Sequence, residues 1–201
     1  MTLLKLTPSF VKQESLKARH FFGLDKLDHA PLDIDGYIYR IGADINLKIG
    51  MKREIGTDAC WGSQFKELFF DKEDFENPSS YRWRFTISHE LGHFFLHKDR
   101  WSTLKDKKSW LKYILGNDAQ RNLEEKDANI FAAYFLMPDS ILSVEFSKIL
   151  SSLPAQKYAQ EGFSDDEIID LLSDDLARIF YVTPSCMQIR ISNYRRYDRI
   201  L

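Results

Sequence analysis

Residues 84–97 read RFTISHELGHFFLH and contain the pattern His89-Glu90-Leu91-Gly92-His93. The apolar residues around this pattern predict a long helix that begins near Ser79 or Ser80. Four residues turn a helix by about 400°, so His89 and His93 face the same side, about one turn apart. Two imidazoles placed in this way can bind one metal ion, and we expect zinc. Glu90 is turned by about 100° from His89, which suits a general base that reaches water beside the metal.

A catalytic zinc needs a third protein ligand and one open position. His97 lies one turn beyond His93, and its ring would be about 12 Å from that of His89 along the helix axis. One ion cannot be reached from both, so we expect His97 to support the site or to pack structurally. Asp99 stands where an extended zinc motif places its third ligand, but that motif needs a glycine at position 96, where this chain has Leu96.

Two further candidates, Glu124 and Glu125, begin a second predicted helix over residues 121–136. Glu125 and Asn129 are four residues apart and share one face of that helix. Glu125 is therefore favoured as the third ligand, with Asn129 as the hydrogen-bond partner of a histidine's second nitrogen. An alternative stays open from the residues alone: Glu124, Glu125 and Asp127 would only complement the N-terminus of the helix.

The rest of the chain predicts an α+β fold in which strands come early and helices late. We expect a small antiparallel or mixed sheet packed against the helix of the metal site, and a mostly helical C-terminal half. The expected domain is single, residues 1–201, with an N-terminal helix and sheet (1–80), metal-site helices (81–138) and C-terminal helices (139–201). The individual elements expected are helices at 8–22, 33–42, 103–114, 139–151, 164–180 and 184–198, strands at 45–54 and 65–71, and a loop at 151–162.

Composition narrows the class of protein. The net charge of −2 gives no broad attraction to nucleic acid or anionic membranes, and the two cysteines, Cys60 and Cys186, form no disulfide framework. No apolar run approaches membrane-spanning length, and the N-terminus lacks the pattern of a secretory signal. We therefore expect a soluble, cytoplasmic protein; its oligomeric state does not follow from the sequence.

The stretches RFTISHELGHFFLH and EKDANIFAAYFLMP together resemble the ImmA/IrrE family of metallopeptidases. The matching residues are Phe85, Thr86, His89, Glu90, Leu91, Gly92, His93 and His97, then Glu125, Asn129, Phe131, Ala132, Ala133, Leu136, Met137 and Pro138. The resemblance covers roughly residues 15–195 and implies a zincin-like fold, zinc bound by His89, His93 and Glu125, and Glu90 as the base. It also implies a protein substrate, a helix-turn-helix transcriptional repressor. The long, charged stretch from Phe94 to Glu124 and the pair Tyr134-Phe135 depart from the family pattern.

The sequence is compatible with two functions. One is a zinc endopeptidase, and the other is a non-catalytic, metal-stabilised module that sequesters a repressor or contacts DNA. His97 and Tyr134 are candidates to contact the substrate or to stabilise its oxyanion. The strand at 65–71 is a candidate edge for a substrate peptide, and an ordinary buried strand is the alternative. Cys60 is a candidate cap for the metal, although a buried, reduced cysteine is the commoner case.

The end of the chain has the outline of a helix-turn-helix and is locally basic through Arg190, Arg195, Arg196 and Arg199. DNA binding would need these charges on an exposed helix face. A packing role is favoured, so direct binding of nucleic acid is not expected.

Overall fold

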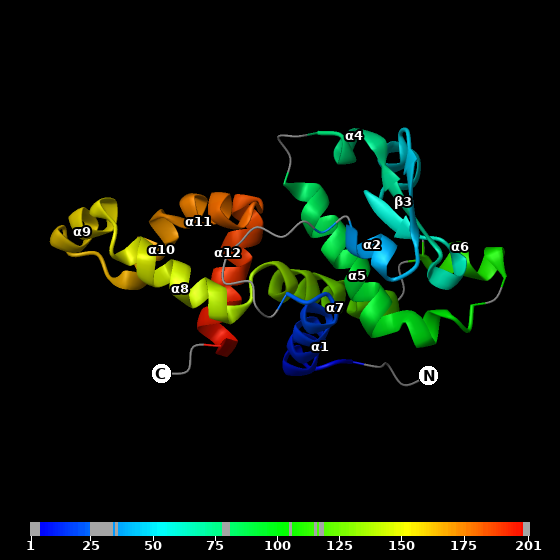
Figure 1. Ribbon diagram of the computed structural model, residues 1–201, viewed down its shortest axis with the longest axis horizontal. Coiled ribbons are helices and arrows are strands. Elements are labelled where there is room, and N and C mark those ends of the chain that lie inside the picture. The colour runs from blue at the N-terminus through cyan, green and yellow to red at the C-terminus, as the bar shows by residue number, and fades with distance from the viewer. Residues whose placement is uncertain are drawn as a thin grey trace. The chain divides into compact units, whose positions relative to one another are not determined.

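The computed structural model describes residues 5–24, 34, 36–77, 81–104, 106–114, 116 and 119–198 (Figure 1). These residues divide into two compact units, one that extends to Phe135 and one that begins at Leu136. The elements of the first unit are α1 (Pro8–Phe21), α2 (Gly36–Arg40), β1 (Asp44–Lys48), α3 (Met51–Ile55), β2 (Ala59–Trp61), the 3-10 turn Ser63–Phe65, β3 (Glu67–Asp71), α4 (Lys72–Phe75), α5 (Arg82–Trp101), α6 (Lys107–Ile114) and α7 (Ala119–Leu136). The elements of the second unit are α8 (Asp139–Leu150), α9 (Leu153–Gln160), α10 (Asp165–Leu171), α11 (Ser173–Phe180), α12 (Pro184–Asn193) and a π-helical turn, Tyr194–Asp198.

The sheet has three strands in the order β1-β3-β2. The pair β1 and β3 is parallel, whereas β2 and β3 are antiparallel, so the sheet is mixed. Together with the helices, it confirms the predicted α+β class. The strand predicted at 65–71, either as an edge or as an ordinary buried strand, is the central strand β3, so the buried alternative is correct. The edge strands of this sheet are β1 and β2.

One strand is shorter than predicted and another was not predicted, in both cases for local reasons. The strand expected over 45–54 ends at Lys48, because Gly50 adopts a left-handed conformation (φ 73°) and α3 starts at the next residue. The strand β2 was not predicted, since its three residues are too few to show an alternating pattern.

The first unit packs α5 against both the sheet and α7. Ile87 and Leu91 of α5 are fully buried, as are Ala128 and Phe131 of α7. A Cβ atom added to Gly92 would lie 3.1 Å from the Cα atom of Ala128, so the two helices approach each other closely at this glycine. An aromatic cluster joins β2, the turn that follows it, α5 and α6, and consists of Trp61, Phe65, Phe94, Trp101 and Trp110.

The second unit is entirely helical in its described part, as predicted for the C-terminal half. The segment 151–162, expected as a loop, contains α9, whose N-cap Ser152 accepts a hydrogen bond from the backbone of Ala155. The single helix expected at 164–180 is broken at Leu172 into α10 and α11. Among the described helices of the chain, none is by itself long and apolar enough to span a membrane; α7 and α8 reach that length and composition only when taken together.

Candidate metal centre

Helix α5 presents both histidines of the opening pattern together with Glu90. His93 is fully buried, Glu90 is 6 % exposed and His89 is partly buried. Trp61 of β2 donates a hydrogen bond from Nε1 to the carbonyl oxygen of Glu90 at 2.7 Å. This contact fastens the central turn of α5 to an edge strand of the sheet.

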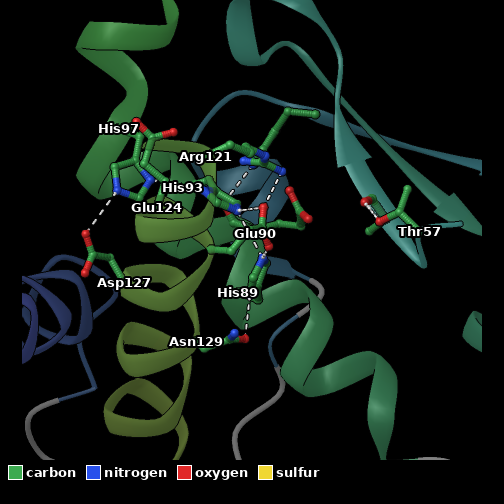
Figure 2. A network of polar contacts seen from close by, with 12 residues as sticks. Thr57, His89, Glu90, His93, His97, Arg121, Glu124, Asp127 and Asn129 are labelled. Carbon is green, nitrogen blue, oxygen red and sulfur yellow. Dashed lines mark hydrogen bonds and ion pairs between the residues drawn. The ribbon is translucent and has the colours of Figure 1, made fainter. Parts of the chain in front are cut away.

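Three side chains from α5 and α7 converge beside that turn. Two of them, His89 and His93, are labelled in Figure 2. The Nε2 atoms of His89 and His93 are 3.0 Å apart. One carboxylate oxygen of Glu125 lies 3.1 Å from Nε2 of His89, and the other lies 3.3 Å from Nε2 of His93. Ligand atoms held about 2.0–2.1 Å from a tetrahedral zinc are about 3.3 Å from one another, so the three groups stand at the spacing that one ion requires. Among the residues that the structure describes, they form the one such cluster of His, Cys, Asp and Glu side chains.

The outer ring nitrogens indicate which tautomer each histidine has. Nδ1 of His89 lies 3.0 Å from Oδ1 of Asn129, which can only accept, so this nitrogen carries the proton. Nδ1 of His93 lies 3.0 Å from Nδ1 of His97, and Nε2 of His97 lies 4.0 Å from a carboxylate oxygen of Asp127. If the proton of His89 faces Asn129 and the proton on Nε2 of His97 faces Asp127, then Nδ1 of His97 accepts the proton carried by Nδ1 of His93. Nε2 of His89 and Nε2 of His93 then each keep a lone pair.

Two nitrogen lone pairs and a carboxylate then face one another across 3.0–3.3 Å, an arrangement that a cation stabilises. Two imidazoles and one carboxylate are a donor set that zinc accepts. The residues present therefore fit a metal ion. The outer nitrogen Nδ1 of His89 contacts Asn129, and that of His93 contacts His97.

Burial and charge shift the pKa values of the site in different directions. Burial lowers the pKa of His93 well below its ordinary value, which keeps that ring neutral. Burial also acts to lower the pKa of His89, but the Glu125 hydrogen bond and the Glu90 charge outweigh it and the pKa is raised. For Glu125, burial acts to raise the pKa, yet the contacts with His89 and His93 hold it far below its ordinary value.

The carboxyl group of Glu90 differs from that of Glu125 because no histidine hydrogen bond compensates its burial. Burial raises the pKa of Glu90 to about 7, with a smaller contribution from the Glu125 charge and opposition from His89 and Arg121. A group with a pKa near the working pH can both accept and return a proton, which is what a general base that later acts as an acid needs.

A pocket of about 250 Å³ lies next to these side chains. Its wall combines the edge strand and the loop before it with α5, α7 and the end of α6. The lining residues are Ile55, Gly56, Thr57, Ala59, Cys60, His89, Glu90, Ile114, Gly116, Arg121, Asn122 and Glu125. A substrate group in this pocket would meet Glu90 and the converging ligand atoms together.

The other residues predicted for the site fall into two groups. Asn129 and His97 contact the outer nitrogens of His89 and His93, as described above and labelled in Figure 2. Tyr134 is buried in α7 with the Nζ atom of Lys12 5.4 Å from its ring centroid, and it is not among the residues that line the pocket. His97 does not line the pocket either, so neither of the two expected oxyanion donors reaches it.

Glu124 has a role that its neighbour Glu125 does not share. Its buried carboxylate forms an ion pair with Arg100 and accepts hydrogen bonds from Trp101 Nε1 at 2.8 Å and from the Tyr113 hydroxyl at 2.5 Å. It thereby fastens the end of α5 and helix α6 to α7. This arrangement also shows how the charged stretch after His97 packs: Trp101 and Trp110 are buried, and Trp110 Nε1 donates to the Trp61 carbonyl at 3.1 Å.

The remaining candidates stand apart from the converging atoms. Asp99 is an exposed residue of α5, which runs on to Trp101 without a turn at Leu96. Cys60 lines the pocket but is not part of the ligand cluster, and burial raises the pKa of its thiol to about 11.

Sequence reasoning missed Arg121 and Trp101. Arg121 lies four residues before Glu125 on α7, forms an ion pair with it and lines the pocket. This spacing could have identified the pair, because oppositely charged residues four apart on a helix are neighbours. The ring of Trp101 stacks on His93 with centroids 4.6 Å apart, and no spacing rule points to that contact.

Comparison with known proteins gives the family. No curated protein matches this chain. The family model described as the IrrE N-terminal-like domain, Peptidase_M78, matches residues 76–192, which is more than half of the chain and includes α5, α7 and every residue of the converging cluster. The predicted resemblance is confirmed: the chain belongs to the IrrE N-terminal-like family of metallopeptidase-like domains.

Proposed function

We propose that this chain is a zinc-dependent endopeptidase that cleaves a peptide bond in a regulatory protein, a helix-turn-helix transcriptional repressor. One observation carries the enzymatic part: Glu90 lines the same pocket as His89 and Glu125, two of the three residues whose ligand atoms converge. A purely structural metal site has no need of such a base. The repressor as substrate rests on the family resemblance, since the family itself implies a protein substrate.

In this proposal His89, His93 and Glu125 hold the metal ion. When bound, zinc supplies Lewis acidity, which lowers the pKa of water and polarises a carbonyl group. The carboxylate of Glu90 accepts a proton from the attacking water while the new C–O bond forms. Glu90 then gives this proton to the amide nitrogen as the C–N bond breaks, so the products are a carboxylic acid and an amine.

The substrate is expected to approach along β2. This strand pairs with β3 on one side, and Ala59 and Cys60 line the pocket beside Glu90. A peptide can add to a sheet edge through main-chain hydrogen bonds. Access ends near Trp61, whose carbonyl oxygen already accepts a hydrogen bond from Trp110.

The alternative function, a non-catalytic module that sequesters a repressor or contacts DNA, has less support at the basic end of the chain. Arg190 is fully buried, where it forms an ion pair with Asp139 and donates to the carbonyl of Met137. Arg195 pairs with Asp166 and Asp170. These charges are used within the second unit, while Arg199 lies outside the described residues. The packing role favoured from the sequence agrees with these contacts.

The direct test compares zinc-loaded wild type with Glu90→Gln on a helix-turn-helix repressor chosen from the same genome. Wild type should convert the repressor to two fragments, whose new termini are identified by mass spectrometry, and Glu90→Gln should slow this by at least about 100-fold. The matched control is Glu76→Gln, the same change at an exposed residue of the first unit. Equal cleavage by wild type and Glu90→Gln would refute the proposed role of Glu90. Binding of the repressor without cleavage by either would favour sequestration.

A further inference from the structure

Arg121 holds one side of the carboxylate that converges with the two histidines. Its guanidinium forms an ion pair with Oε1 of Glu125, one helical turn further along α7. The other oxygen, Oε2, faces His89 Nε2 at 3.1 Å. Oε1 also lies 3.3 Å from His93 Nε2, so each oxygen of Glu125 faces one histidine, and among the described residues Arg121 pairs with Oε1.

The guanidinium is fixed in place by more than this ion pair. Its central carbon lies 4.9 Å from the centroid of the Trp101 ring, and the Arg121 side chain is 12 % exposed. The same ring stacks on His93 and donates from Nε1 to Glu124. Trp101 thus supports both a histidine of the cluster and the arginine that contacts Glu125. A planar guanidinium can stack on an aromatic ring and hold a carboxylate at the same time, which an ammonium group cannot do equally well.

The charged residues that line the pocket also favour a lasting contact between Arg121 and Glu125. Arg121 is the one lysine or arginine among the described residues that line it, and two carboxylates, those of Glu90 and Glu125, line it as well. Opposite charges attract more strongly where one partner is shielded from water, and the Arg121 side chain is 12 % exposed. The contact between Arg121 and Glu125 is therefore suited to persist when the histidines and Glu125 hold a cation.

From this geometry we infer that Arg121 is a positioning residue that makes Glu125 a ligand through one oxygen only. The inference rests on the proposed metal site. A carboxylate that binds through both oxygens would add one more oxygen neighbour to the metal and crowd the position that a catalytic metal keeps open for water. By engaging Oε1, Arg121 leaves Oε2 for the metal and preserves that position.

The test reads coordination rather than activity. Cobalt(II) replaces zinc, and the visible absorption is recorded, because four-coordinate cobalt absorbs much more strongly than five-coordinate cobalt. X-ray absorption of the zinc-loaded protein counts the oxygen neighbours of the metal. Wild type should give the intense four-coordinate spectrum. Arg121→Met should weaken the absorption at least about twofold and add one oxygen neighbour, and Arg121→Lys should recover part of the wild-type spectrum because the positive charge remains.

Lys126→Met is the matched control: it removes a positive charge from the residue after Glu125, at an exposed position of α7, and should leave both spectra unchanged. If Arg121→Met does not fold, Arg121→Gln takes its place. Unchanged spectra in a folded variant would overturn the inference. Absence of metal binding by wild type would instead overturn the proposed metal site, so the two failures can be told apart.

Discussion

The Nδ1 atom of His89 on α5 lies 3.0 Å from the Oδ1 atom of Asn129 on α7. Asn129 follows Glu125 by one helical turn, so one face of α7 meets the His89 ring at both nitrogens. The carboxylate of Glu125 lies 3.1 Å from Nε2, and the amide of Asn129 orients Nδ1. Partners of this kind fix the tautomer and the ring plane of a metal-binding histidine.

Replacing Asn129 by alanine should weaken zinc binding by about 10–100-fold, because the proton on His89 Nδ1 loses its acceptor. Competition with a chelating fluorophore measures this dissociation constant. Asn46→Ala is the control, since it removes an amide that donates to Glu67 between two strands of the sheet, and Asn46 is not among the residues that line the pocket. Equal affinity in Asn129→Ala and wild type would show that the contact does not orient the ligand.

Glu124 and Glu125 should respond to mutation in opposite ways. Glu124→Gln places a neutral amide among Arg100, Trp101 and Tyr113. It should lower the free energy of unfolding by about 2–4 kcal/mol, below the value for a wholly buried pair because Arg100 is 29 % exposed and can rehydrate. Urea unfolding measures the loss. The folded protein should still bind zinc stoichiometrically.

Glu125→Ala is the complementary variant. It should lose zinc at concentrations that saturate wild type, because two histidines alone bind the ion weakly. Metal analysis after gel filtration gives the stoichiometry. Full zinc content in Glu125→Ala, or loss of zinc in a folded Glu124→Gln, would mean that the two adjacent glutamates have been assigned the wrong way round.

Much of the core of the candidate site could be predicted because it depends on helical periodicity. The spacing of His89 and His93, and that of Glu125 and Asn129, each sets two side chains on one face of one helix, and the structure brings the two faces together. The α+β class follows in the same way from the order of strands and helices. Pairings within one element need no knowledge of the tertiary fold.

The features that could not be predicted depend on contacts between elements. Nothing in the sequence of residues 65–71 tells whether the strand lies at the centre of the sheet or at its edge, since strand order is set by packing. Trp101 meets His93 through stacking at the end of α5, and two residues of β2, Ala59 and Cys60, supply one wall of the pocket. The composition of 151–162, rich in serine with a proline and a glycine, indicates a loop, yet Ser152 and Pro154 here begin a helix.

Arg190 should be essential to the stability of the second unit. Arg190→Met removes the partner of Asp139 and the donor to the Met137 carbonyl, and should cost about 2–4 kcal/mol, somewhat below the value for a wholly buried pair because Asp139 is 26 % exposed and can rehydrate. Chemical denaturation followed by circular dichroism measures the change. Arg178→Met, at a 72 % exposed arginine paired with Asp175, should cost no more than about 0.5 kcal/mol. Similar losses in the two variants would contradict the structural role of Arg190.

Gly92 lies between the two histidines of α5, at the point where this helix meets α7. A methyl group added there would lie 3.1 Å from Ala128 Cα, 3.2 Å from its carbonyl oxygen and 3.2 Å from Phe131 Cβ. Two of these atoms are backbone and cannot rotate away, so Gly92→Ala must separate the helices. Alanine favours a helix by about 1 kcal/mol over glycine, whereas overpacking costs about 1–3 kcal/mol. The clash should therefore prevail, with a lower melting temperature.

The same change should also weaken zinc binding, because two of the proposed ligands lie on α5 and the third on α7, and separating the helices moves them apart. Calorimetry and chelator competition measure the two effects on one preparation. Gly36→Ala is the matched control, since a Cβ atom at that helical glycine meets nothing within 4 Å and should leave the zinc affinity unchanged and the stability equal or slightly higher. A Gly92→Ala protein as stable as wild type and with the same zinc affinity would mean that α5 and α7 can shift without disturbing the ligands, and that the close approach at Gly92 does not set the geometry of the site.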